Sequence, residues 1–260
     1  MSFTKISLKR FRCFEELELD LSPGVNFFYG TNGSGKTSIL ESIFMFSSGK
    51  SFKSSNIASL INYKFDNFNL KAFDSERGYV AEIQKNINKP ISVQLNNSKI
   101  TTSKLIREFP CSPIHNNTFS FADAPPEFRR KLLDRSIFIA DEKFSSIWFS
   151  FYRSLKQRNS SLKKGIRDEI PVWNNSFIKE GESLSCLRRS FFELTLLEFK
   201  NFLNLTKPNN IFSFFKDINI TFFNGWGDDQ GLNDVLENNV EADFRRKTTT
   251  KGPHKADIKF

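Results

Sequence analysis

The chain has 260 residues, enough for one large domain or two modest ones, and its 31 Phe residues can supply a hydrophobic core, which argues against disorder. Its net charge of +9 favours polyanionic partners such as nucleic acid, although ordinary solvated lysines would produce the same excess. The three cysteines are widely spaced, which argues against a disulfide framework, and with two histidines a His-based metal site is not expected. The sequence shows no signal peptide and no run of 18 apolar residues, which argues against a membrane span. Together these features predict a cytoplasmic protein.

The beginning of the chain has the pattern of β-strands. Apolar and polar residues alternate over residues 3–9 and 17–21, and a Ser-Pro-Gly turn follows at residues 22–24. Residues 25–29, VNFFY, form a continuous apolar run, which is typical of a buried strand covered on both faces. From Lys36 onward the apolar spacing becomes helical.

Short strands are also predicted over residues 67–101. The segments FNLKAF, YVAEIQ and ISVQL alternate between apolar and polar residues. Asn96 and Asn97 lie between two such runs, as in a tight hairpin turn.

The second half of the chain is mainly helical in pattern. The segment Pro125-Pro126-Glu127 fits a helix start, and apolar residues at helical spacing predict a long amphipathic helix over residues 144–162. A further helix is predicted over residues 183–205. Strand patterns return at residues 218–223 and 256–260.

One segment matches the G-x-x-x-x-G-K-[ST] pattern of a phosphate-binding loop, between the predicted strand and helix. Its residues are Gly30, Thr31, Asn32, Gly33, Ser34, Gly35, Lys36 and Thr37. Glycines let the backbone wrap around phosphate, and the helix N-terminus favours an anion. Lys36 would reach the β- and γ-phosphates and the Thr37 hydroxyl would bind Mg²⁺, so we predict ATP and Mg²⁺ as cofactors.

A second ATPase element, the carboxylate at the end of an apolar strand, is imitated by the segment IFIADE at residues 137–142. The surrounding residues continue a helical period, so we interpret Asp141 and Glu142 as surface carboxylates. The upstream segment FSFA at residues 119–122 lacks the glycines of a transporter-type signature, and two prolines follow it. The sequence therefore predicts no catalytic residue.

Several blocks together resemble the RecF family of SMC-like ATPases, and the resemblance extends over the whole chain. The blocks are FRCF at 11–14, PGVNFFYGTNGSGKTSILESI at 23–43, PPEFRRKLLD at 125–134, YRSLKQRNSSLKKG at 152–165 and TKGPHKADIKF at 250–260. The last three are more specific than the phosphate-binding loop, because they distinguish this family from other P-loop ATPases.

The resemblance implies an α/β fold: a P-loop NTPase head of the ABC/SMC type, with a β-rich N-terminal lobe and an α-helical insertion lobe. It implies an ATPase lobe at residues 1–120, a helical lobe at 121–207, and a return to the ATPase lobe at 208–260. Arg12 matches an arginine that approaches the nucleotide phosphates in this class, and Asn32 matches its polar loop residue.

The family also implies a function. Its members bind ATP and DNA in recombinational repair, DNA replication and the SOS response to DNA damage. They dimerise on ATP binding and act at gaps in double-stranded DNA, without sequence preference, together with recombination mediator proteins. Full-length members are expected to be weak DNA-dependent ATPases.

The chain departs from the family in two respects. Lys255 and Ala256 stand where the family usually has Arg and Asp, while Asp257 is retained. The sequence also contains neither the signature nor the Walker B strand of the family, so we expect a chain truncated before both. Such a chain is expected to be poorly stable and unable to hydrolyse ATP.

The sequence leaves open which other protein classes could carry this head and which residues contact DNA. Another SMC-like ATPase or nuclease head would need a long coiled coil or an acidic nuclease segment, and a P-loop kinase or transporter subunit would need a lid or signature. Arg130 and Arg158 lie within family blocks, where pairing with carboxylates is an alternative to binding DNA. Small basic clusters that could contact DNA phosphates occur at residues 129–131, 163–164, 188–189 and 245–247.

Overall fold

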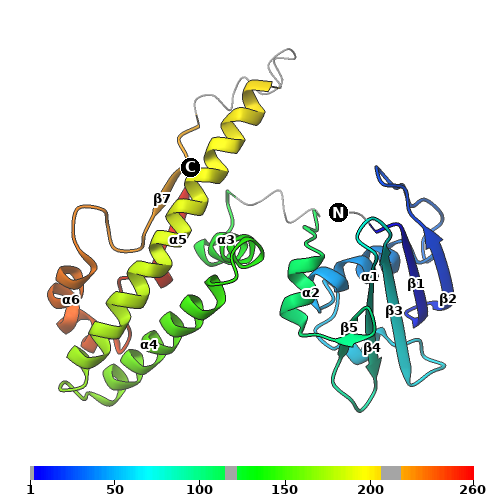
Figure 1. The fold of residues 1–260 in the computed structure, drawn as a ribbon. Coiled ribbons are helices and arrows are strands. Elements are labelled where there is room, and N and C mark those ends of the chain that lie inside the picture. Colours follow the sequence, from blue (N-terminus) through cyan, green and yellow to red (C-terminus); the bar gives the residue numbers. More distant parts are fainter. Residues whose placement is uncertain (1–2, 115–121, 206–217) are drawn as a thin grey trace. The chain divides into compact units, whose positions relative to one another are not determined.

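The computed structural model describes residues 3–114, 122–205 and 218–260, and it divides the chain into two compact units (Figure 1). The first unit comprises residues 1–114 and the second comprises residues 115–260. Each unit has a hydrophobic core of its own. In the described part of the chain, none of the helices combines the length and the apolar character of a membrane span.

A six-stranded antiparallel sheet, in the order β2-β1-β3-β4-β5-β6, forms the base of the first unit. Its strands are β1 Lys5–Phe11, β2 Phe14–Asp20, β3 Asn67–Asp74, β4 Tyr79–Asn86, β5 Ser92–Leu95 and β6 Ser98–Lys99. The helices of this unit are α1 Lys36–Ser48, the 3-10 helix η1 Ile57–Leu60 and α2 Thr102–Glu108. The strands predicted from alternation are confirmed: every second side chain of β3 is buried, and Ile6 and Leu8 of β1 are buried as well.

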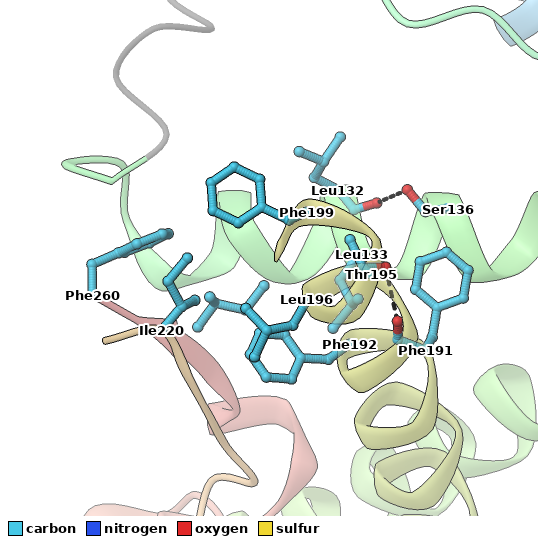
Figure 2. A pocket seen from close by; sticks show the side chains of 11 residues that line it. Leu132, Leu133, Ser136, Phe191, Phe192, Thr195, Leu196, Phe199, Ile220 and Phe260 are labelled. Carbon is cyan, nitrogen blue, oxygen red and sulfur yellow. Dashed lines mark hydrogen bonds between the residues drawn. The ribbon is translucent and has the colours of Figure 1, made fainter. Parts of the chain in front are cut away.

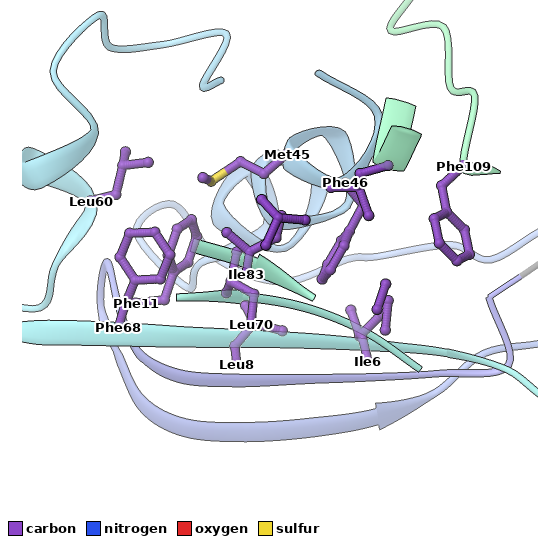
Figure 3. Close-up of a cluster of buried hydrophobic side chains, with 14 of the residues drawn as sticks. Ile6, Leu8, Phe11, Met45, Phe46, Leu60, Phe68, Leu70, Ile83 and Phe109 are labelled. Atoms are coloured by element: carbon purple, nitrogen blue, oxygen red, sulfur yellow. The ribbon is translucent and has the colours of Figure 1, made fainter. Parts of the chain in front are cut away.

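The core of the first unit lies between this sheet and α1. Ile6 and Leu8 of β1 and Leu70 of β3 are buried on the same face, and Met45 and Phe46 of α1 meet them (Figure 3). Burying one such side chain fully contributes about 1.5–3 kcal/mol, so this layer fixes α1 against the sheet. The phosphate-binding loop directly precedes α1, and its position is therefore set by the core.

The turn between β5 and β6 is the predicted one. Asn96 and Asn97 both have positive φ, 48° and 64°, as the central residues of a type I′ turn require. The Asn96 side chain also accepts a hydrogen bond from the backbone N–H of Val80 at 2.7 Å, which ties the turn to β4.

Residues 25–29 differ from their prediction as a buried strand. They pair with no strand among the described residues, and Val25, Phe27 and Tyr29 are exposed. Only Phe28 packs against the core of the first unit. The prediction was wrong because an apolar run forms a strand only where a neighbour pairs with its backbone N–H and C=O groups.

Helices dominate the second unit. They are α3 Pro126–Ala140, α4 Phe144–Lys164, α5 Ile170–Leu205 and α6 Leu232–Arg246, with the 3-10 helix η5 Pro253–Lys255. Its two strands, β7 Thr221–Phe223 and β8 Asp257–Lys259, form an antiparallel pair. The predicted start at Pro126, the amphipathic helix α4 and the strand character of both β7 and β8 are confirmed.

Two helices of the second unit differ from expectation. Helix α5 begins at Ile170 rather than at residue 183. Helix α6 was not predicted, although Leu232, Val235 and Leu236 are buried at helical spacing and Asp234 favours the helix N-terminus. Asparagines within α6 weaken its helical pattern, since Asn has a low helix propensity.

Two buried arginines connect the helices of this unit to its last residues. Arg129 of α3 donates from both Nε and Nη2 to the carboxylate of Asp257, at 2.7 and 2.9 Å. Arg188 of α5 makes the same two-bonded pair with Asp134 of α3 at 2.7 Å, and its Nη1 donates to the carbonyl of Pro253. Paired donors of this kind fix orientation as well as distance.

A third buried arginine, Arg158 of α4, donates to Asp243 of α6 and to the Thr249 hydroxyl, at 2.7 Å each. Of the two alternatives that the sequence left open for Arg158, the structure shows pairing with a carboxylate. Arg130, by contrast, donates to the backbone carbonyl of Ala256 at 2.6 Å. The family blocks that include these arginines thus form the interior of the second unit.

The observed division of the chain has two parts where the sequence suggested three segments. Described residues 218–260 pack with the helices of the second unit, through Phe222, Leu232 and Ala256 of its core. Residues 119–121, part of the weak signature-like segment, lie outside the described residues.

Candidate nucleotide-binding site

The phosphate-binding loop ends directly at the N-terminus of α1. Gly30, Gly33 and Gly35 have φ values of 147°, 86° and 93°, a region that disfavours other residues. At Gly35 a Cβ atom would also clash with the Phe14 ring, so this position requires glycine for two reasons. The sequence motif therefore reflects a real backbone constraint.

Lys36 points into this loop. Its Nζ donates to the carbonyls of Gly30 and Thr31, at 2.9 and 2.7 Å. The ammonium is thus held over the loop, where phosphate oxygens would be better acceptors because they carry charge.

The first turn of α1 offers further donors. Gly35 is its N-cap residue and provides no side-chain cap, and the first turn contains no acidic residue. Backbone N–H groups in the first turn of a helix lack partners within the helix, and the helix dipole adds a partial positive charge. Thr37 is exposed in this turn and lines the cavity beside the loop. The arrangement is suited to an anion.

Arg12 lies beside the loop and is held by a residue that the sequence analysis did not single out. Its Nε and Nη2 donate to the two carboxylate oxygens of Glu41, both at 2.8 Å, and Nη1 donates to the Ser59 carbonyl at 3.4 Å. A guanidinium has five N–H donors, so two of them stay available to a ligand.

Glu41 itself is completely buried. Burial acts to raise its pKa, but hydrogen bonds from Arg12 and from the Ser51 hydroxyl outweigh this effect and keep the pKa below its usual value. Glu41 is therefore a carboxylate that orients Arg12. Its position five residues after Lys36 gave no signal in the sequence that distinguished it from a surface residue.

These groups surround a cavity of about 570 Å³. Among its lining residues are the predicted residues Arg12, Asn32, Gly33, Gly35, Lys36 and Thr37. Gly30 and Thr31 contribute through the carbonyls that hold Lys36, and the Ser34 hydroxyl lies against Gly30. The structure thus brings together every residue predicted for the site.

Lys53 and Tyr63 are among the lining residues that the sequence analysis missed. Lys53 adds a second ammonium group to the cavity, and Tyr63 adds an aromatic ring that is 88% exposed. Both follow α1 by more than a helical turn in irregular segments, where no periodic pattern marks them.

The segment at residues 137–142, which resembles a Walker B strand in sequence, lies at the end of a helix, as predicted. Ile137 and Ala140 belong to the last turn of α3, and Asp141 is its C-cap residue. Asp141 is half-buried rather than fully exposed, and Glu142 is exposed. Within the described residues, no group of three or more His, Cys, Asp or Glu side chains could hold a metal ion.

A different cavity, of about 250 Å³, lies in the second unit (Figure 2). Its walls are almost entirely apolar and include Leu133 of α3, Phe192 and Leu196 of α5, Ile220 and Phe260. Phosphate needs hydrogen-bond donors, so this cavity is unsuited to a nucleotide.

Known proteins share both the sequence and the fold. The family model of the RecF/RecN/SMC N-terminal domain matches residues 2–138, more than half of the chain. The DNA replication and repair protein RecF of Pseudoalteromonas translucida is 35% identical over 268 residues, covering 100% of this chain and 72% of the relative. RecF of Cronobacter sakazakii is 32% identical over 264 residues, with the same coverage.

Among solved structures, the recombination mediator protein RecF bound to ATP in the RecFOR pathway matches with a TM-score of 0.77 and 21% identity, covering 98% of this chain and 72% of that one. At that identity the match concerns the fold alone, which is that of a P-loop ATPase head. The family model and the similarity, over the whole of this chain and 72% of the relatives, to proteins that are 30% identical or more carry the assignment: this chain belongs to the RecF family.

Proposed function

We propose that the cavity beside α1 binds ATP, and that the chain acts as an ATP-dependent DNA-binding protein of recombinational repair. The observation that carries the nucleotide part is Lys36, held over a glycine loop at an uncapped helix N-terminus. The Lys36 ammonium, the backbone N–H groups of the glycine loop and those of the first turn of α1 lie around one cavity. A triphosphate requires hydrogen-bond donors and positive charge of this kind.

Each residue has a role in this proposal. The first-turn N–H groups of α1 and the Lys36 ammonium bind the β- and γ-phosphates, and Arg12, oriented by Glu41, reaches an outer phosphate oxygen. In this proposal the Thr37 hydroxyl binds Mg²⁺, which would neutralise charge between the phosphates; Thr37 is among the residues that line the cavity. Tyr63 offers an aromatic face to the base.

Binding, rather than hydrolysis, is what these residues support. No Asp or Glu is among the described residues that line the cavity. An ATPase needs a carboxylate there to complete the Mg²⁺ site and to orient water. We therefore propose that the residues of this cavity bind ATP without hydrolysing it at a useful rate.

The DNA part of the proposal follows from the family and from the charge of the chain. The relatives are named as DNA replication and repair proteins, and the net charge of +9 favours a polyanion. We propose that ATP binding favours a homodimer that is retained on duplex DNA at gaps, together with recombination mediator proteins. Nucleotide would then act as a switch between two states of association.

The nucleotide proposal is tested by replacing Lys36 with Ala and measuring the binding of a fluorescent ATP analogue. Loss of a charge-assisted contact should weaken binding by roughly 10- to 100-fold, from about 1.5–3 kcal/mol. Lys50→Ala, an exposed lysine just after the same helix, is the matched control and should bind normally. Equal affinity of the Lys36→Ala variant and the wild type would overturn the proposal.

The switch is tested separately, by measuring retention on a gapped duplex with and without ATP and Mg²⁺. The wild type should be retained more strongly with nucleotide, and Lys36→Ala should lose that difference. Retention that ignores nucleotide in both proteins would leave ATP binding intact but exclude the switch.

A further inference from the structure

The structure sorts the basic clusters of the sequence into two kinds. Arg129 and Arg188 are buried and bind carboxylates, while Lys131 and Arg189 form surface ion pairs with neighbouring acidic residues. These side chains are therefore used within the second unit. The remaining clusters are Lys163-Lys164, at the end of α4, and Arg245-Arg246-Lys247, at the end of α6.

The fold brings these two clusters together although they lie far apart in the sequence. Arg158 of α4 and Asp243 of α6 form an ion pair of 2.7 Å in which both side chains are fully buried. Thr249, just after α6, donates from its backbone N–H to Asn159 of α4 at 2.7 Å, and Thr250 donates to Asp243 in the same way at 2.9 Å. The C-terminal ends of α4 and α6 are thus fastened to each other (Figure 1).

A second fastening lies at the surface. Arg167, which follows α4, makes two hydrogen bonds to Glu241 of α6, and its guanidinium stacks over the Phe244 ring at 4.4 Å. Lys164 lies three residues before Arg167, and Arg245 directly follows Phe244. Because consecutive Cα atoms are about 3.8 Å apart, the backbones of both clusters lie within about 15 Å of this contact.

We call these residues the tip surface: Lys163, Lys164, Arg245, Arg246, Lys247 and Lys251. All six are exposed, and none forms an ion pair with a carboxylate in the described part of the chain. Of the nearby carboxylates, Glu241 binds Arg167 and Asp243 binds Arg158, whereas Asp168 is exposed and Glu169 accepts a hydrogen bond from the neutral Ser161 hydroxyl. The six cations of the tip surface therefore outnumber the two nearby carboxylates that no arginine of the described structure binds, Asp168 and Glu169, and the surface carries an excess of positive charge.

We propose that the tip surface binds the phosphate backbone of duplex DNA. The proposal rests on the proposed DNA-binding function and assigns it a place. A duplex presents one negative charge per about 1.7 Å of its axis, so several cations on one rigid surface can neutralise several phosphates at once. Exposed Lys and Arg side chains contact phosphates without reading bases, which fits sequence-independent binding.

A purely structural role explains only part of this charge. Cations in the last turn of a helix offset its dipole, and Lys163 and Lys164 are placed to do so for α4, as are Arg245 and Arg246 for α6. Lys247 and Lys251 lie beyond the last turn of α6, where the dipole no longer accounts for them. A dipole role also predicts a change in stability, and a DNA role predicts a change in the salt dependence of binding.

The test compares two variants of the full chain that lose the same charge. The tip variant carries Lys163→Gln, Lys164→Gln, Arg245→Gln and Arg246→Gln. The control variant carries Lys143→Gln, Arg153→Gln, Lys179→Gln and Lys200→Gln, at exposed positions elsewhere in the second unit. Binding to a labelled gapped duplex is measured by fluorescence anisotropy with ATP and Mg²⁺ over a series of salt concentrations.

We expect the tip variant to bind at least tenfold more weakly than the control variant at about 0.1 M salt. The slope of log K against log salt should fall by about 0.9 for each phosphate contact removed. Arg245→Lys with Arg246→Lys keeps the charge and should bind like the wild type. Circular dichroism confirms that each variant is folded, so a loss of binding can be assigned to the surface.

The outcomes separate the two proposals. If the wild type does not bind the duplex, the DNA part of the proposed function fails and this assignment fails with it. If the wild type binds but both variants lose affinity equally, only the tip surface is excluded. If the tip variant loses binding to phosphatidylserine vesicles and keeps binding to the duplex, the surface recognises acidic membranes instead, which also overturns the proposal.

Discussion

At the residue scale, the second unit depends on Arg158, whose guanidinium is fully buried against Asp243 and Thr249. Removing the arginine would leave Asp243 as a buried carboxylate without its cation, which typically destabilises a protein by about 3–5 kcal/mol. We predict that Arg158→Met lowers the free energy of unfolding by that amount in urea titrations. Arg153→Met, on the exposed side of the same helix, should change it by less than about 0.5 kcal/mol. Similar losses in both variants would contradict this assignment.

His254 should give the second unit a dependence on pH. Its Nε2 donates to the Thr249 carbonyl at 2.9 Å, which leaves Nδ1 as an acceptor that is buried without a hydrogen-bond partner in the described structure. Burial lowers the pKa of His254 from 6.5 to about 4; the Thr249 carbonyl and Asp243 oppose this shift, while Lys255 and Arg130 favour it.

The direction of the effect follows from linkage. Between pH 6.5 and about 4 the unfolded chain binds a proton that the folded chain does not, so stability falls as pH falls through that window. The loss is at most about 3 kcal/mol, and the contribution is complete above pH 6.5. Urea midpoints at pH 7.5 and 4.5 should differ less in His254→Asn than in the wild type. An identical difference in both proteins would contradict the prediction.

At the element scale, the strands of the first unit were predictable because each carries its own signal. Ile6 and Leu8 alternate with polar residues in β1, as do Phe68 and Leu70 in β3, so one face must be buried. The phosphate-binding motif, residues 30–37, likewise fixed the start of α1 at Lys36. These features depend on neighbours within a few positions, which a sequence shows directly.

Other elements depend on partners that are distant in the sequence. Residues 25–29 are as apolar as a buried strand, yet the described chain offers them no pairing neighbour. Glu41 has an ordinary place on α1, and its role appears only when Arg12 is beside it. The tip surface could not be predicted from the sequence, because Lys164 and Arg245 are far apart along the chain and only the contact between α4 and α6 brings their clusters together.

The β5–β6 turn allows a prediction about a single element. Asn96 holds a left-handed conformation and bonds both the Val80 N–H and the Gly78 carbonyl, whereas Asn97 contributes its conformation alone. Asn96→Ala should therefore lower the free energy of unfolding by about 1–2 kcal/mol, from strain and lost hydrogen bonds. Asn97→Gly should be neutral or slightly stabilising, because glycine favours this turn position. Thermal unfolding compares them, and equal losses would rule out the special role of Asn96.

At the scale of the whole molecule, the chain contains two hydrophobic cores rather than one. The buried residues of the first core lie between Ile6 and Phe109, and those of the second lie between Leu133 and Ala256. This division places the phosphate-binding cavity and the tip surface in different units. If ATP binding controls dimerisation and retention on DNA, the effect would therefore have to involve both units.

Separate cores predict that damage to one unit stays within it. Leu70 in β3 and Leu184 in α5 are both completely buried, and replacing either with Ala should cost about 2–5 kcal/mol, because a cavity remains. Hydrogen exchange followed by mass spectrometry should show that Leu70→Ala loses amide protection in the sheet and α1, while α4 and α5 keep theirs. Leu184→Ala should show the reverse pattern, since each core stabilises its own hydrogen bonds. Loss of protection across both units in either variant would mean that the chain unfolds as a single cooperative body, and that its two cores are coupled.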